Sequence, residues 1–90
     1  MTYRDLSIDF FINTFAVSFD GDVIVDVIDG DITIVAFSGV CDCMYRGESA
    51  EYLTSGAWFD SLKAKALANP MFIAAVNETV AYEEKAKAGA

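Results

Sequence analysis

Hydrophobic and polar residues alternate from the start of the chain. The apolar positions of the first run are Leu6, Ile8, Phe10 and Ile12, and the positions between them are Ser7, Asp9 and Phe11. A period of two is typical of a β-strand with one buried face. Thr2 and Asp5 resemble a helix capping box, so a short N-terminal helix is the alternative, but the alternation favours a strand. The pattern shifts at Asn13, where we expect a bulge or a break.

Residues 19–31 combine two Asp-Gly pairs with a run of valine and isoleucine. Such pairs predict tight β-hairpins, here with a three-residue loop at residues 19–21 and a two-residue loop at residues 29–30. The loops pair Val17 with Val23 and Phe15 with Val25, then Val27 with Ile32, Val25 with Ile34 and Val23 with Ala36. One face of this sheet is then almost wholly apolar. The other face is mixed and presents Ala16, Ser18, Ile24, Asp26, Thr33, Val35 and Phe37, with Ile24 facing Val35.

The C-terminal half shows the spacing of helices. We expect the third strand to continue past Gly39 through a bulge, and residues 46–48 to end it. A helix is predicted over residues 49–68, with Ser49 as N-cap and a break near residues 54–56 as an alternative. Asn69 and Pro70 supply an N-cap and a first helical residue, which predicts a second helix over residues 70–88.

These elements predict an α+β fold in a single domain over residues 1–90. Its sheet is an antiparallel β-meander within residues 6–45. The meander has three strands, or four if the N-terminal strand joins it. The two C-terminal helices pack on one face of the sheet, because a half-apolar sheet must bury that face against another layer.

The charge of the chain is strongly acidic and unevenly distributed. The formal net charge is -8 at pH 7, and residues 1–44 contain eight aspartates but one basic residue, Arg4. This charge favours solubility, but it also attracts basic proteins and repels nucleic acid and anionic membranes. We therefore expect a basic protein surface as the partner, with no direct contact to nucleic acid or membrane. The residues expected to contact it are Asp20, Asp22, Asp26, Asp29 and Asp31.

The apolar content is high for so small a chain. Hydrophobic residues make up 54% of the 90 residues, which suggests a second buried surface besides the core. We expect a homodimer, formed through Ile24, Val35 and Phe37 on the mixed face or through an edge strand. Cys41 and Cys43 are too close in sequence for an unstrained disulfide, so we expect reduced thiols and a cytoplasmic location. The N-terminus does not have the pattern of a signal peptide.

The sequence offers little catalytic or metal-binding chemistry. It contains no histidine, the usual general base near neutral pH, so an enzyme is not expected; Asp26 and Asp42 are the candidates if it is one. The two Asp-Gly-Asp triplets do not match an EF-hand loop, and two thiols alone do not complete a zinc site. We therefore expect neither a metal nor a cofactor.

Two functions are consistent with these features. The first is a small acidic inhibitor or adaptor that occupies a basic, nucleic-acid-binding surface of another protein. In size and charge the chain resembles small phage proteins that disable host defence enzymes, such as anti-CRISPR and anti-restriction proteins, although no motif assigns a role to any residue. The alternative is an oligomeric small-ligand-binding or sequestering protein with a pocket between subunits. The residues expected to line that pocket are Phe37, Tyr45, Tyr52 and Trp58, with Arg4 or Arg46.

Overall fold

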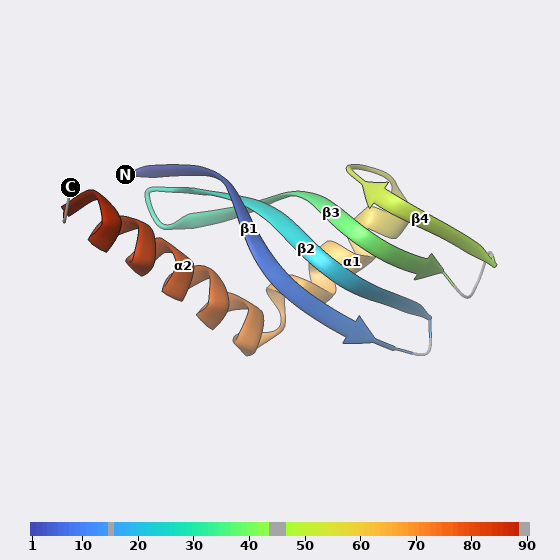
Figure 1. Ribbon diagram of the computed structural model, residues 1–90. Coiled ribbons are helices and arrows are strands. Elements are labelled where there is room, and N and C mark those ends of the chain that lie inside the picture. Colours follow the sequence, from blue (N-terminus) through green and yellow to red (C-terminus); the bar gives the residue numbers. More distant parts are fainter. Residues whose placement is uncertain (15, 44–46, 89–90) are drawn as a thin grey trace.

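The protein is an antiparallel sheet followed by two helices. A computed structural model describes residues 1–14, 16–43 and 47–88 (Figure 1). The elements in chain order are β1 (Thr2–Asn13), β2 (Val17–Ile28), β3 (Asp31–Cys43), β4 (Glu48–Leu53), α1 (Ala57–Leu67) and α2 (Pro70–Ala88). The four strands are neighbours in the order of the sequence, β1-β2-β3-β4. The predicted α+β meander with two C-terminal helices is therefore confirmed, and the N-terminal segment is a strand.

The first predicted hairpin loop is wrong, because β2 runs without interruption through residues 19–21. Gly21 lies opposite Phe10 of β1 and Gly39 of β3. A tight hairpin loop places its glycine at positive φ, and Gly21 is not among the residues with positive φ. The chain instead reverses after Asn13, where the Thr14 amide and hydroxyl both donate to the Val17 carbonyl oxygen, at 3.0 and 2.7 Å.

This correction also changes the predicted partners of β2. Val23 pairs with Ile8 and Phe37, and Val25 pairs with Leu6 and Ile34. The pair of Val17 with Val23 is therefore not formed, and the pair predicted for Phe15 lies outside the described residues.

The second predicted hairpin is confirmed at its turn. Asp29 and Gly30 have φ of 51° and 88°, as a two-residue turn of this kind requires. Val27 pairs with Ile32 and Val25 with Ile34, as expected.

Beyond these pairs the register shifts. β3 contains one extra residue, Val35, so Ile24 lies opposite Ala36 and Val23 opposite Phe37. The pairs of Val23 with Ala36 and of Ile24 with Val35 are therefore wrong. The bulge also turns Phe37 inward, where it is fully buried, so its predicted place on the mixed face is corrected.

The helix predicted over residues 49–68 begins eight residues later, at Ala57. Residues 49–53 belong to β4, which pairs with β3 and is preceded by Gly47, where φ is 60°. The suggested break at residues 54–56 thus lies directly before the helix, with Gly56 as N-cap. The helix α2 has the predicted bounds, and the Asn69 side chain accepts a hydrogen bond of 2.9 Å from the Met71 amide.

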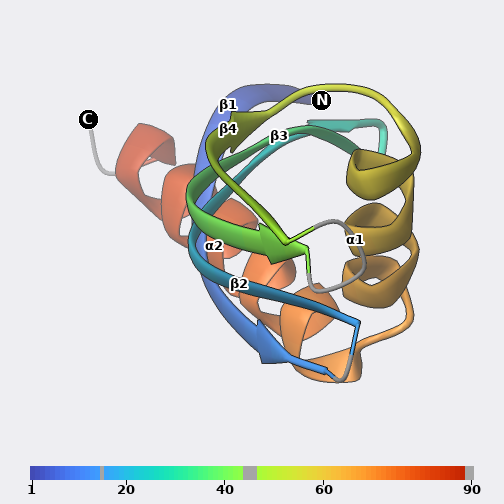
Figure 2. The ribbon, with the colours of Figure 1, turned by 90° about the vertical axis from the view of Figure 1, so that its right-hand side faces the viewer.

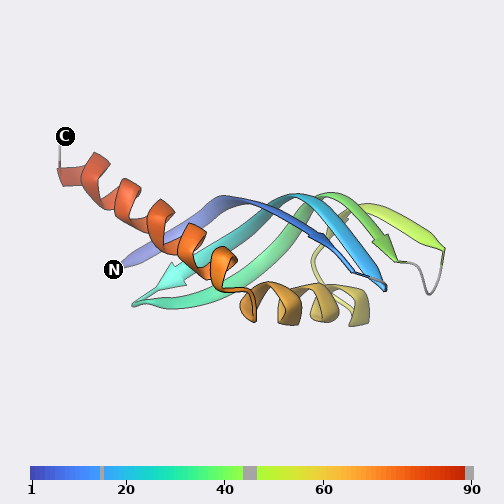
Figure 3. The ribbon, with the colours of Figure 1, turned by 90° about the horizontal axis from the view of Figure 1, so that it is seen from below.

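Aromatic side chains join the sheet to both helices. Edge-to-face contacts connect Phe10 with Phe72 of α2, Phe19 with Phe37, and Phe37 with Phe59 of α1, at 5.1, 5.1 and 5.6 Å between ring centroids. Both helices lie on the concave side of the sheet, which arches over them (Figures 2 and 3). The convex side of the sheet therefore faces solvent. Among the residues that the structure describes, no helix is long and apolar enough to cross a membrane.

Candidate partner-binding surface

The convex face of the sheet gathers acidic residues from β1, β2 and β3. Apart from Gly21, which has no side chain, their neighbours in sequence are buried, so the alternation of the strands directs these side chains to the solvent side. Asp9 pairs with Asp22, and Asp20 pairs with Phe11 on one side and Val40 on the other. We call this set the acidic face. Its members are Asp9, Asp20, Asp22 and Asp42, with the apolar side chains Phe11, Val40 and Tyr52.

Large apolar side chains are exposed within the acidic face. Phe11, Val40 and Tyr52 have 66%, 58% and 59% of their surface exposed. Phe11 lies directly opposite Asp20, whereas Tyr52 pairs with Ser38, which pairs with Asp22, so Tyr52 is two strands from Asp22 on the same side of the sheet. Exposed aromatic residues beside charges are typical of protein-protein contact sites.

The aspartates of the acidic face repel one another. Asp9 and Asp22 lie directly opposite each other on neighbouring strands, an arrangement that destabilises a sheet when both residues carry the same charge. Within residues 1–14, 16–43 and 47–88, the ion pairs are those of Asp26 with Arg4 and of Asp29 with the N-terminal amine. Neither pair neutralises Asp9, Asp20 or Asp22.

The five aspartates predicted to bind the partner do not form one patch. Asp20 and Asp22 belong to the acidic face. Asp29 and Asp31 lie at the turn between β2 and β3, and Asp29 is seven residues beyond Asp22 or about 23 Å along the strand. A hydrogen bond of 2.9 Å from the N-terminal amine, and the charge of that amine, lower the pKa of Asp29.

The fifth residue, Asp26, has a structural role. Its side chain is only 16% exposed, and its carboxylate accepts hydrogen bonds from the Arg4 guanidinium, at 3.3 Å, and from the Asp5 amide, at 3.0 Å. Asp5 has φ of 55° at a register shift in β1. Asp26 therefore stabilises a bulge in β1, and both of its carboxylate oxygens accept hydrogen bonds within the chain.

Sequence reasoning missed several residues of the acidic face. Phe11, Val40 and Tyr52 were not assigned to it, although Phe11 occupies a polar position in the alternation of Ser7, Asp9 and Phe11. That alternation was the available signal. The false loop at residues 19–21 hid the pairing of Asp20 with Val40, and the helix predicted over residues 49–68 contained Tyr52.

The residues predicted for self-association are only partly exposed. Val35 is 37% exposed and Ile24 is half-buried on the convex side, whereas Phe37 belongs to the core. Two of the residues expected to line a small-ligand pocket are engaged elsewhere: Phe37 is buried in the core, and Arg4 forms an ion pair with Asp26. Two more of its residues, Tyr45 and Arg46, lie outside the described residues.

The two cysteines are free and buried. Cys41 and Cys43 are both free thiols on the inner side of β3. Burial, together with the charge of Asp42, raises the pKa of Cys41 to about 11. Asp42 in turn accepts a hydrogen bond of 2.7 Å from the Ser49 hydroxyl. In the part of the chain that the structure describes, no cluster of cysteine and acidic side chains is arranged to hold a metal ion.

Comparison with known proteins finds no matching family model, no matching curated protein and no matching solved structure.

Proposed function

We propose that this protein is a small acidic binding module whose acidic face docks on a basic surface of another protein, where it acts as an inhibitor or adaptor. The observation that supports this best is the direct opposition of Asp9 and Asp22 beside exposed Phe11. Like charges placed opposite each other lower the stability of the sheet, and a cationic partner removes that repulsion on binding. Residues that oppose folding in this way are characteristic of functional surfaces.

The spacing of the acidic face suits separate contacts with several basic side chains. Neighbouring strands are about 4.8 Å apart, and Asp20 and Asp22 are about 6.6 Å apart along β2, so each carboxylate can accept its own arginine or lysine. The exposed rings of Phe11 and Tyr52 add apolar contact area, which supplies binding energy that salt does not screen.

The shape of the sheet indicates what kind of basic surface fits. The sheet is arched (Figure 2), and strand alternation directs the acidic face to its convex side, so the complement of this face is a concave, positively charged cleft. Clefts of this kind hold nucleic acid in proteins that bind its backbone. The proposed partner is therefore a nucleic-acid-binding protein, and occupation of its cleft would exclude the nucleic acid. The phage proteins that disable host defence enzymes are the class with this profile.

Affinity capture tests the proposal. The protein is immobilised beside a triple variant, Asp9→Asn with Asp20→Asn and Asp22→Asn, and beside a matched control with Asp60→Asn, Glu78→Gln and Glu84→Gln. The control removes the same number of exposed charges from the helices. We expect the native protein and the control to retain nucleic-acid-binding proteins that elute with rising salt and with added duplex DNA or RNA, and the triple variant to lose them. Equal retention by both variants would contradict the proposal.

A further inference from the structure

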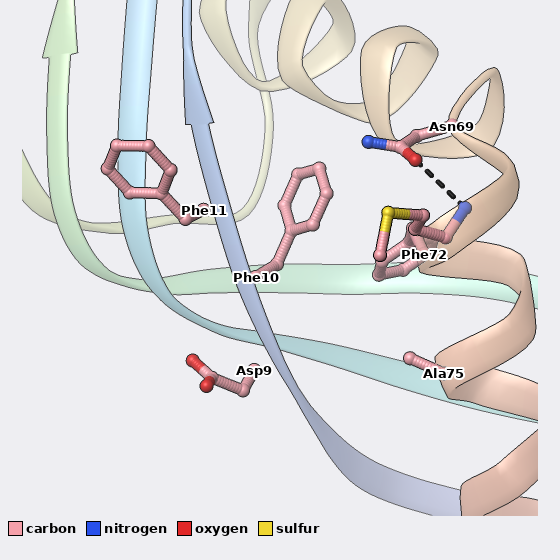
Figure 4. Close-up of a pocket in the computed structure, with 7 residues that line it drawn as sticks. Asp9, Phe10, Phe11, Asn69, Phe72 and Ala75 are labelled. Carbon is pink, nitrogen blue, oxygen red and sulfur yellow. Dashed lines mark hydrogen bonds between the residues drawn. The ribbon is translucent and has the colours of Figure 1, made fainter.

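A groove runs between the free edge of β1 and the beginning of α2. It has a volume of about 290 Å³ and is lined by Asp9, Phe10, Phe11, Asn69, Met71, Phe72 and Ala75. One wall consists of three consecutive residues of an edge strand, and the other wall consists of the first turns of a helix (Figure 4). An edge strand beside a helix is the arrangement in which extended peptides add a strand to a sheet.

The part of β1 that borders this groove has the regular geometry of a strand that can accept a partner. From Leu6 to Asn13 each residue of β1 pairs with one residue of β2, without a register shift. β1 is the first strand of the sheet, so its other side has no strand beside it among the described residues. Its backbone groups on that side are available for a further strand.

The other edges of the sheet are modified in ways that discourage strand addition. The first part of β1 has the bulge at Asp5, with its positive φ, and packs against the end of α2, where the Lys87 ammonium is 4.9 Å from the centroid of the Tyr3 ring. At the opposite edge, β4 is short, from Glu48 to Leu53, and its pairing with β3 is irregular. Bulges and short strands are common protections of sheet edges. Residues 6–13 have neither.

The helical wall of the groove is apolar. Met71 is 81% exposed at its lip, whereas Phe72 is buried at its floor and Ala75 is half-buried. A flexible methionine adapts to different apolar side chains. The amide of Met71 is already capped by Asn69, so the wall presents little polarity at this helix start.

The two sides of β1 at the groove differ in chemistry. Asp9 and Phe11 point to one side of the strand and Phe10 to the other, toward Phe72 (Figure 4). A strand added along this edge would alternate in the same way, because opposite residues on neighbouring strands share a face. Its residues on the convex side would lie beside Asp9, and its residues on the concave side would face the apolar wall of α2.

We propose that the groove binds an extended segment of the partner as a fifth strand, in which basic residues alternate with apolar residues. The inference rests on the proposed function, since the same partner would cover the acidic face. The basic side chains continue the contact with the acidic face, and the apolar side chains pack on Met71, Phe72 and Ala75.

Synthetic peptides test the groove with defined probes. The first is a short peptide with blocked ends in which lysine alternates with valine; the second has the same composition in two blocks; the third is the alternating peptide methylated on every backbone nitrogen. We expect the alternating peptide to slow amide hydrogen exchange in residues 6–13. We expect the other two peptides to bind with an affinity lower by about tenfold or more. The second lacks the alternating pattern, and the third cannot form the backbone hydrogen bonds.

A pair of variants connects binding to the groove. Met71→Lys places a positive charge at the lip, and Ala74→Lys places the same charge on the exposed face of α2. We expect the alternating peptide to bind Met71→Lys about tenfold more weakly than the native protein and Ala74→Lys within about twofold. Both substitutions are at exposed positions, so the fold is retained in each.

The outcomes separate the two proposals. If no lysine peptide binds in a salt-dependent manner, the proposed function fails together with the groove. If all three peptides bind equally, or Met71→Lys and Ala74→Lys behave alike, the acidic face binds cations but the strand-addition site is overturned. A third outcome is that, without peptide, the protection of the amides of residues 6–13 rises with protein concentration and the mass of the protein in solution doubles. The occupant of the groove is then a second copy of this chain, and the inference is also overturned.

Discussion

At the scale of single residues, Gly21 and Gly39 determine how closely β2 and β3 approach. A Cβ atom at Gly21 would lie 2.4 Å from the Ser38 carbonyl oxygen and 2.7 Å from the Gly39 Cα atom. Both neighbours are backbone atoms and cannot move without disturbing the ladder. The glycines therefore serve the contact between two strands, at the place where the sequence pattern had indicated a turn.

Gly21→Ala should consequently destabilise the protein. We expect the free energy of unfolding, measured by urea denaturation, to fall by about 2 kcal/mol or more, because the added methyl group forces the strands apart. Gly30→Asn is the control: Gly30 has φ of 88°, a Cβ atom there would have no neighbour within 4 Å, and asparagine tolerates positive φ. If both variants were equally stable, the close approach of β2 and β3 would not be needed for folding.

The buried thiol of Cys41 gives a second prediction. Since its pKa is raised to about 11, its thiolate fraction at pH 8 is about a hundredfold lower than that of an ordinary cysteine. In a Cys43→Ala variant, alkylation by iodoacetamide at pH 8 should be slower than that of free cysteine by at least this factor. Mass spectrometry follows the reaction, and unfolding in urea should restore the normal rate. Rapid alkylation of the folded protein would show that Cys41 is accessible.

The same pKa shift makes the stability depend on pH. A raised folded-state pKa contributes stability that is complete below the ordinary pKa of the thiol and is lost as pH rises through the folded-state value. The free energy of unfolding should therefore fall between pH 9 and about 11. Burial and the carboxylate of Glu84 also raise the pKa of Tyr3, which acts in the same direction. Cys41→Ala should reduce this fall in parallel denaturation experiments; an unchanged pH profile would exclude Cys41 as a cause.

At the scale of elements, the sequence predicted best where a local signal was sufficient. Asn69 and Pro70 define the start of α2 by capping and by a fixed φ, both of which act within a single turn. The turn at Asp29 and Gly30 is likewise local. The strand β4 was mistaken for helix because Leu53 continues the spacing of α1, whereas the strand forms through its pairing with β3. The bulge at Val35 was missed because a register shift is set by packing across strands.

The candidate site was predictable only in part for the same reason. Its charge is visible in the sequence, and Asp20 and Asp22 were named from it. Which acids share a face depends on register, however, and a single false loop separated Asp9 from Asp22. The role of Asp26 depends on a contact with Asp5, which is remote in sequence and adopts an uncommon backbone conformation. No periodicity along one strand reveals such a contact.

The cap of α2 can be tested at this scale. Asn69→Ala removes the hydrogen bond from the Met71 amide and should lower the free energy of unfolding by about 1 kcal/mol. Asn77→Ala is the matched control, since Asn77 is exposed in the middle of α2 and alanine has the higher helix propensity. We expect the control to be neutral or slightly more stable. Equal effects of the two substitutions in urea denaturation would show that the cap does not stabilise α2.

At the scale of the whole molecule, shape and charge act together. The protein is elongated, with extents of 47 × 20 × 18 Å, and the chain carries a formal net charge of -8 at pH 7. The helices cover one side of the sheet, so the aspartates of the first three strands concentrate on the other. Self-repulsion of this kind reduces the stability of a compact state and is screened by salt. A long arched sheet with one acidic side thus stores an unfavourable energy that a basic partner can release.

Asp22→Asn separates stability from binding. The substitution removes the repulsion between Asp22 and Asp9, so we expect the free energy of unfolding at low salt to rise by about 0.5 kcal/mol, with a smaller gain at high salt. Binding of a lysine-rich peptide should weaken at the same time, because one of its carboxylate contacts is lost. Glu78→Gln, on the exposed side of α2, is the control and should change neither quantity appreciably. A substitution that raises the free energy of unfolding and weakens binding is the expected result when a charge is retained for binding at the expense of folding. If Asp22→Asn destabilised the protein, or left peptide binding unchanged, the acidic face would be a solvated surface and not a binding site.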